Sequence, residues 1–237
     1  MPPCDGVISY GSETIAFHIL YVERKTLEIA VHPDSAVVVK APLGTALAEV
    51  EQRVRKRAGW IMRQIDYFRQ FDPRTPPRRY VGGETHLYLG RQYRLKIDHS
   101  EAEGVKLVGR YFRIGIRKSA AADRAQILLR DWYVKKATCR FSESFERCWP
   151  VFAKLGLIRP RLQIRRMQKR WGSLSRKGLL TLNPDLVRAP RECIDYVITH
   201  ELCHLQYHDH GPGFYRLLEK VMPDWEKRKH KLELALV

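Results

Sequence analysis

The spacing of apolar residues changes once near the start of this chain, and the change constrains the fold more than any other feature. Residues 6–41 alternate apolar and polar side chains, with breaks at Gly11, Pro33 and Pro42. A period of two predicts three or four antiparallel strands. Across residues 45–71 the apolar positions recur every three or four residues, which predicts a long amphipathic helix. We therefore expect an antiparallel, β-rich N-terminal region that ends in a long helix.

A proline-rich segment marks the next boundary. Residues 72–79, DPRTPPRR, cannot continue the helix, because proline lacks a backbone N–H and its ring clashes with the preceding turn. This segment predicts two parts, a β-rich subdomain with its helix over residues 1–76 and a second part over residues 77–237.

The second part mixes strands and helices, so the whole chain is expected to be α+β, and no internal repeat is evident. Paired strands with glycine turns are predicted within residues 80–97 and 105–116, and a shorter strand within residues 161–167. A hairpin is expected to turn at Lys177 and Gly178. Helices are predicted over residues 121–155 and from Pro190, a good first-turn residue, through His204.

The chain is strongly basic. Lysine and arginine number 43 against 26 aspartates and glutamates, which gives a formal net charge of +17. Such an excess favours polyanionic partners such as nucleic acid or nucleotides. No nucleic-acid-binding motif accompanies the charge, so solubility with adventitious nucleic-acid affinity is the alternative explanation.

Nothing in the sequence indicates export or a membrane partner. No uninterrupted apolar run approaches the roughly 18 residues of a membrane span, and residues 1–10 lack a basic end followed by an apolar stretch. The 5 cysteines are scattered without a CxxC pair, which indicates reduced thiols. We therefore expect a cytoplasmic protein.

Residues 200–204 read HELCH, an HExxH motif. On a helix, residues four apart lie on one face, so His200 and His204 can both reach a single ion. Glu201 can take a proton from metal-bound water, whose pKa zinc lowers to roughly 7. The motif therefore predicts a zinc site with these histidines as ligands and Glu201 as general base.

A catalytic zinc site needs a third protein ligand and an open position. In a continuous helix His208 would lie about 12 Å along the axis from His200, at 1.5 Å per residue, and could not share the ion. His210 stands just before Gly211, where the helix is expected to have ended. We favour His210 as the third ligand, with Glu219 and Glu226 as alternatives.

One position departs from the metzincin pattern HExxHxxGxxH. Tyr207 stands where that pattern has glycine. A tyrosine held at positive φ costs on the order of 1 kcal/mol or more. The turn between His204 and His210 must therefore be built differently.

The motif HELCHLQYHDHGPGFY, together with residues 165–190 and 80–95, resembles the YgjP-like metal-dependent hydrolases, relatives of the SprT and WLM zinc metallopeptidases. The resemblance implies that His200, His204 and His210 bind one zinc ion per chain and that Glu201 is catalytic. It also implies a minimal zincin core, a helix pair beside a small sheet whose edge strand runs past the metal. Residues 163–173 are the expected edge strand.

The same resemblance shows one departure. Leu174 replaces the cysteine of the family's usual WGSCS segment. A packing role for this position is therefore simpler than a chemical one.

Basic and aromatic residues near this segment are candidate substrate contacts. A guanidinium group can pair bidentately with a phosphate or a carboxylate, although a charge run at a strand end is usually just solvated. The predicted substrate-binding residues are Arg166, Lys169, Arg170, Trp171 and Ser173.

The predicted function is a zinc-dependent hydrolase in which metal-activated water attacks a peptide bond, the peptide target following from the resemblance. The basic cluster favours one alternative, hydrolysis of a nucleotide phosphoanhydride. A second alternative is a zinc-stabilised nucleic-acid-binding protein without turnover. The predicted partners are a peptide, protein or nucleotide substrate, and nucleic acid or another polyanion on the basic surface.

Overall fold

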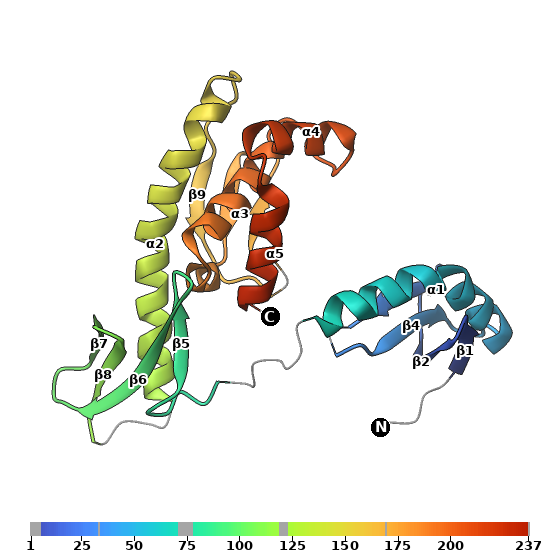
Figure 1. Ribbon diagram of the computed structural model, residues 1–237, viewed down its shortest axis with the longest axis horizontal. Coiled ribbons are helices and arrows are strands. Elements are labelled where there is room, and N and C mark those ends of the chain that lie inside the picture. The colour runs from blue at the N-terminus through green and yellow to red at the C-terminus, as the bar shows by residue number, and fades with distance from the viewer. Residues whose placement is uncertain (1–5, 33, 71–77, 119–122, 169, 237) are drawn as a thin grey trace. The chain divides into compact units, whose positions relative to one another are not determined.

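The computed structural model describes residues 6–32, 34–70, 78–118, 123–168 and 170–236. The chain divides into two compact units, Met1–Thr75 and Pro76–Val237 (Figure 1). Most of the proline-rich segment predicted to separate them lies outside the described residues. The fold class is α+β, as predicted, with small sheets and helices in succession along the chain.

The first unit is a four-stranded sheet covered by one helix. Its elements are β1 (Gly6–Tyr10), β2 (Glu13–Val22), β3 (Glu28–Val31), β4 (Val37–Pro42) and α1 (Leu47–Arg69), and the strand order is β1-β2-β4-β3. The stripe that predicted α1 is its buried face: Val50, Val54, Ala58, Ile61 and Ile65. These residues pack on the buried side chains of β1, β2 and β4 and form the core of the unit.

The central strands of this sheet are parallel, where the sequence had predicted antiparallel strands throughout. Phe17 of β2 pairs with Val37 of β4 in parallel register, and β3 pairs antiparallel with the other side of β4. Val37, Val39 and Ala41 are almost completely buried. Because β4 carries the most buried side chains, it takes the interior position between β2 and β3, and it then runs in the same direction as β2.

The second unit begins with another four-stranded sheet and a long helix. The elements are β5 (Thr85–Tyr88), β6 (Arg91–His99), β7 (Gly104–Val108), β8 (Tyr111–Ile116) and α2 (Arg124–Ala153), with strand order β5-β6-β8-β7. Leu95, Phe112 and Ile114 are buried on the side that faces α2. Phe112 makes an edge-on contact with Trp132 of α2 at 5.0 Å between ring centroids.

The two units therefore share one plan that was not evident in the sequence. In each unit the first strand of the sheet lies at one edge and pairs with the second. The second strand runs parallel to the fourth, and the third strand pairs with the fourth at the other edge. A helix follows the fourth strand in the chain. Even the first turn is matched, since Gly11 and Gly90 both have positive φ, 62° and 76°. The two units repeat the order of strands and the pattern of burial, and not the amino-acid sequence. Different apolar residues can fill equivalent buried positions, so the repeat leaves no sequence similarity.

The rest of the second unit carries a small sheet and three helices. Its elements are β9 (Arg161–Ile164), β10 (Gly172–Leu174), β11 (Leu179–Leu182), the 3-10 helix η1 (Pro184–Arg188), α3 (Arg191–Cys203), α4 (Pro212–Val221) and α5 (Trp225–Leu236). The strand order is β10-β11-β9, so β11 is central. Helix α3 contacts α2, α4 and α5 (Figure 1), and it also contacts β10.

The single edge strand predicted over residues 163–173 is wrong in one respect, because two strands share this segment. Strand β9 ends at Ile164 and β10 begins at Gly172. Between them, the side-chain amide of Asn183 donates to the carbonyl oxygens of Met167 at 2.8 Å and Arg170 at 3.2 Å. These bonds hold the intervening backbone away from a strand path, so that β9 and β10 lie at opposite edges of the sheet.

The cysteines of the described residues, Cys139, Cys148, Cys193 and Cys203, are all free thiols. None of the helices in the described part of the chain has the length and apolar character that crossing a membrane requires.

Candidate metal centre

Helix α3 places the HExxH motif at its C-terminal end. His200 and Glu201 lie in its last turn, and His204 is the residue at which the helix stops. His200 and His204 lie on the same face of the helix, as its period requires, and their rings meet edge to face with centroids 5.3 Å apart. Ile194, Val197 and Ile198 of α3 are buried in the core, so the motif stands on a rigid support.

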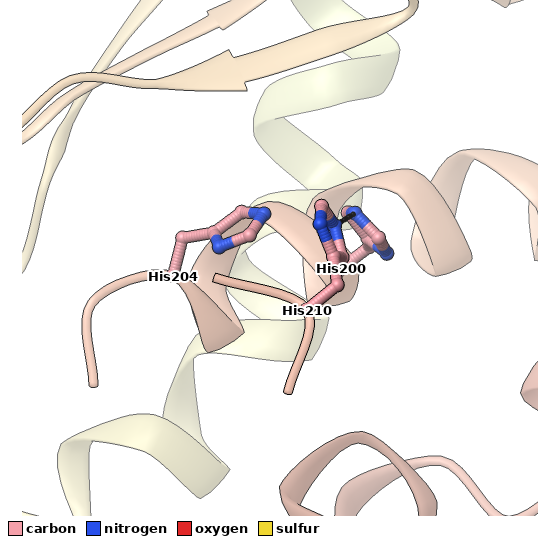
Figure 2. A group of neighbouring side chains, drawn as sticks. All are labelled: His200, His204 and His210. Carbon is pink, nitrogen blue, oxygen red and sulfur yellow. Dashed lines mark hydrogen bonds between the residues drawn. The ribbon is translucent and has the colours of Figure 1, made fainter. Parts of the chain in front are cut away.

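The chain turns back after α3 and brings a third histidine to the pair. One ring nitrogen each from His200, His204 and His210 lies within 4.8 Å of the others. Nε2 of His210 is 3.0 Å from Nε2 of His200 (Figure 2). The structure thus brings together the three residues that the sequence predicted as metal ligands.

The turn between His204 and His210 is built without a left-handed residue. Among the described non-glycine residues, only Ser35, Tyr80 and Leu89 have positive φ. The N–H of Tyr207 donates to the carbonyl of Cys203 at 3.0 Å. The Tyr207 ring fits closely over Gly213, where a Cβ would lie 2.6 Å from Cε1 of the ring. The turn therefore needs no glycine at position 207, and Gly213 leaves room for the Tyr207 ring.

Phe214 of α4 forms an apolar floor under the three imidazoles. Its ring centroid lies 4.9 Å from that of His200, and 4.7 Å from those of His204 and His210. Phe214 is fully buried, with 0% exposure. Because one aromatic ring touches all three histidines, their spacing depends on α4 as well as on α3.

The protonation of the histidines suits metal binding. Burial, with the neighbouring rings of His204 and His210, lowers the pKa of His200 to about 4. Nδ1 of His204 lies 2.8 Å from the carbonyl oxygen of Tyr207, which can only accept, so the proton is on Nδ1. The lone pair of His204 is therefore on Nε2, the nitrogen left free to bind an ion.

This donor set fits a transition-metal ion. Nδ1 of His200 is buried without a hydrogen-bond partner in the described residues, so the ring is not held as an ordinary hydrogen-bonded core histidine. Two neutral imidazoles facing each other can share at most one hydrogen bond, whereas an ion accepts a lone pair from each of three rings. Imidazole nitrogens suit zinc, copper, iron and nickel.

Glu201 lies beside the triad in a nearly enclosed position. Its exposure is 9%. Burial raises the pKa of its carboxyl to about 7, against the opposing effects of a hydrogen bond from the backbone N–H of Leu174 and the charge of Arg170. A carboxyl with this pKa can accept and return a proton near neutral pH.

The triad and Glu201 face a pocket of about 710 Å³. Strand β10 with its flanking residues forms part of its wall, and α5 forms another part. Lining residues outside the HExxH motif are Arg170, Trp171, Gly172, Ser173, Leu174, Arg176, Tyr196, Val197, His208, His210, Lys229, Leu232 and Glu233.

The predicted substrate contacts divide between two places. Arg170, Trp171 and Ser173 line the metal pocket. Arg166 does not, because its guanidinium lies 3.4 Å from the Asp185 carboxylate and lines a different depression beside α2. Lys169 lies outside the described residues.

The other candidates for a third ligand lie away from the triad. His208 lines the pocket, but it is not one of the clustered histidines. Within the described part of the chain, the residues grouped closely enough to hold an ion do not include Glu219 or Glu226.

Sequence reasoning missed several residues of this pocket. Tyr196 lies four residues before His200 on the same face of α3, and its ring centroid is 5.9 Å from that of His200. This helical spacing could have identified it. Lys229 and Glu233 of α5 gave no such signal, because only the packing of α5 against α3 brings them to the pocket.

The family model of the YgjP-like metallopeptidase domain matches residues 25–235. The chain belongs to the YgjP-like metallopeptidase family. The predicted resemblance is thereby confirmed, and membership makes the protein a metal-dependent hydrolase of the metallopeptidase class.

One solved structure with sequence similarity is the metallopeptidase zymogen of Pyrococcus abyssi abylysin. It is 29% identical over 38% of this chain and 87% of that chain, with a TM-score of 0.33. A search of curated proteins found no match to this YgjP-like chain.

Proposed function

We propose that this protein is a zinc-dependent peptidase in which His200, His204 and His210 hold one zinc ion and Glu201 is the general base. The observation that carries the proposal is the placement of a His triad and a buried carboxylate in a single pocket. Three protein ligands leave a zinc ion one open position, which is the arrangement of catalytic rather than structural sites.

The ion, when bound, would act as a Lewis acid that polarises a carbonyl group and acidifies water. The chain itself supplies the proton transfers. The Glu201 carboxylate accepts a proton during attack and can return it to the departing amine, because its raised pKa of about 7 makes both directions accessible.

Strand β10 is the proposed binding surface for the peptide. It pairs with β11 on one side and lies at the edge of its sheet. Gly172, Ser173 and Leu174 of this strand line the metal pocket. An extended peptide can add to such an edge through its backbone, which would hold a scissile bond beside the metal. Arg170 and Trp171 would contact its side chains.

One observation favours a second candidate, hydrolysis of a phosphoanhydride. Arg170, Arg176 and Lys229 bring three cationic side chains to the pocket, where Glu233 is the nearest partner of Lys229 at 3.9 Å. Cations around a metal would suit a triphosphate. A structural zinc site without turnover is less favoured, because such sites are normally closed by four protein ligands.

The test uses the full-length chain loaded with zinc. It is incubated with a library of quenched fluorescent peptides and, separately, with nucleoside triphosphates while phosphate release is followed. Glu201→Gln should abolish peptide cleavage and leave one zinc per chain. Glu219→Gln, an exposed glutamate on α4, is the matched control and should keep full activity. Cleavage of triphosphates alone would replace the peptidase proposal with the second candidate.

A further inference from the structure

The sheet β5–β8 has one covered face and one open face. On the covered face, Leu95 and Phe112 are buried in the core with α2. Because side chains alternate across a strand, their neighbours point to the other side of the sheet. Arg94, Lys96 and Tyr111 are exposed there. The open face thus presents cationic side chains and an aromatic ring to solvent.

Strand register places these groups in adjacent rows. Arg94 of β6 lies opposite Tyr111 of β8, which in turn lies opposite Val108 of β7. Lys96, Arg113 and Lys106 form the next row in the same way. Neighbouring strands are about 4.8 Å apart. Tyr111 therefore has Arg94 beside it on the next strand, and the cationic row of Lys96, Arg113 and Lys106 is the next row along the same face.

Most of this positive charge is not neutralised by the protein. Arg113 donates to the carboxylate of Asp98 at 2.8 Å. Within the described residues, Arg94, Lys96 and Lys106 have no ion pair, and neither does Arg110. A chain with a net charge of +17 has thus gathered unpaired cations on one flat surface.

The surface is also hollowed and rigid near Tyr111. A depression of about 750 Å³ is lined by Arg91, Arg94, Arg110 and Tyr111, among others. The N–H of Arg94 donates to the carbonyl of Arg110 at 2.9 Å, which fixes the β7–β8 turn to β6. Tyr111 is 45% exposed, so part of its ring is accessible to a planar group.

We propose that this face binds single-stranded nucleic acid. We call it the basic sheet face and define it by Arg94, Lys96, Lys106, Arg110 and Tyr111. A base stacks on Tyr111, and the flanking phosphates lie against Arg94 and Arg110. An exposed ring on a flat sheet selects single strands, because only an unpaired base offers its face for stacking.

The basic sheet face is separate from the metal centre. Its sheet approaches the N-terminal end of α3, where a Cβ at Gly90 would lie 2.7 Å from Pro190. His200 and His204 lie at the other end of that helix. A helix of this length spans about 20 Å. The inference therefore does not depend on zinc or on turnover.

Fluorescence anisotropy with the full-length chain tests the proposal. The probes are labelled dT12 and U12 single strands and a 12-base-pair duplex of mixed sequence, each titrated at salt concentrations from about 50 to about 200 mM. Loss of base stacking in Tyr111→Leu should weaken single-strand binding by on the order of tenfold, whereas Tyr111→Phe should bind like the wild type. Comparing dT12 with U12 shows whether DNA or RNA is preferred.

A pair of charge-matched double variants tests the phosphate contacts. Arg94→Gln/Arg110→Gln should weaken binding and reduce the slope of log affinity against log salt by about 1.4, since each single-strand phosphate contact contributes about 0.7. Arg216→Gln/Lys220→Gln removes the same charge from exposed positions of α4 and should leave the slope unchanged. Circular dichroism confirms that all variants fold.

Three results would overturn the proposal. One is equal loss of affinity in both double variants, which would mean diffuse attraction to net charge. Another is binding of the duplex as tight as that of the single strands with no effect of Tyr111→Leu. The third is no binding of any probe at 50 mM salt. Glu201→Gln should bind the probes like the wild type, so a failed peptidase proposal would leave this one standing.

Discussion

Gly172 lies directly against Glu201: a Cβ at position 172 would be 2.7 Å from Cγ and 2.9 Å from Oε1 of that glutamate. Strand β10 thus approaches α3 so closely that only glycine fits between them. The contact with the general base makes position 172 part of the catalytic geometry, although the residue has no functional group of its own.

Gly172→Ala should therefore lower peptidase activity without removing the metal. The added methyl group displaces the Glu201 carboxylate, and misplacement of about 1 Å can cost on the order of a hundredfold in rate. The measurements are kcat for a cleaved peptide and zinc content by elemental mass spectrometry. Gly104→Ala in β7, where an added Cβ meets no atom within 4 Å, is the control. Unchanged kcat in Gly172→Ala would show that the carboxylate tolerates the displacement.

Metal content should depend on the triad alone. His200→Ala, His204→Ala and His210→Ala each remove a ligand and should lose most of the one zinc per chain expected for the wild type. His208 lines the same pocket but is not one of the three ligands, so His208→Ala should retain the zinc ion. Elemental mass spectrometry after removal of loosely bound ions gives the result. Loss of zinc from the His208 variant as well would require a different ligand set.

Removal of the metal should also lower thermal stability. The ligands come from the end of α3 and from the loop before α4, so an ion bound to all of them ties the two segments together. A ligand present at about 100 times its Kd adds about 2.7 kcal/mol to the free energy of unfolding. The Tm of the chelator-treated protein should fall and recover on addition of zinc. In His210→Ala the same treatment should leave Tm nearly unchanged.

Tyr196→Phe should reduce kcat more than it changes zinc content. Burial raises the pKa of the Tyr196 hydroxyl, so it stays protonated at neutral pH and can serve as a donor in the pocket. Loss of a donor to a developing oxyanion costs on the order of a hundredfold in rate. Tyr215→Phe is the control, since its ring packs against Trp225 at 5.6 Å between centroids. Equal activity of wild type and Tyr196→Phe would limit Tyr196 to packing.

The anchoring of α3 on α2 gives a prediction for stability. The Asp195 carboxylate accepts hydrogen bonds from Ser144, which is 1% exposed, and from Arg147 at 2.8 Å. Asp195→Ala leaves the buried hydroxyl without its acceptor and should lower the free energy of unfolding by about 1–3 kcal/mol. Asp98→Ala, which breaks the surface pair with Arg113, should change it by less than about 1 kcal/mol. Urea denaturation measures both.

Local patterns predicted α1, α2, α3 and most strands, because their periods report directly on which face is buried. The stripe from Val50 to Ile65 is the buried face of α1. Strand order was beyond such patterns. Whether β4 lies at an edge or in the interior depends on packing against α1, which involves residues far away in the sequence. The parallel central pairs and the repeated plan were missed for the same reason.

The residues of the site also differ in whether local sequence could predict them. His200, Glu201 and His204 follow from one helical turn. His210 could be favoured but not fixed, because its position depends on Tyr207 packing over Gly213. Gly172 was passed over while its neighbours were chosen, since no local signal shows that a strand approaches a helix so closely.

The order of elements along the chain has a consequence for protein synthesis. The first unit is complete by residue 75, so it can fold while the rest of the chain is still being made. The metal pocket is different: its β10 wall precedes the histidines, but the α5 wall, residues Trp225–Leu236, follows them. The pocket is therefore completed only after the three ligands have been made, when this last helix packs against α3.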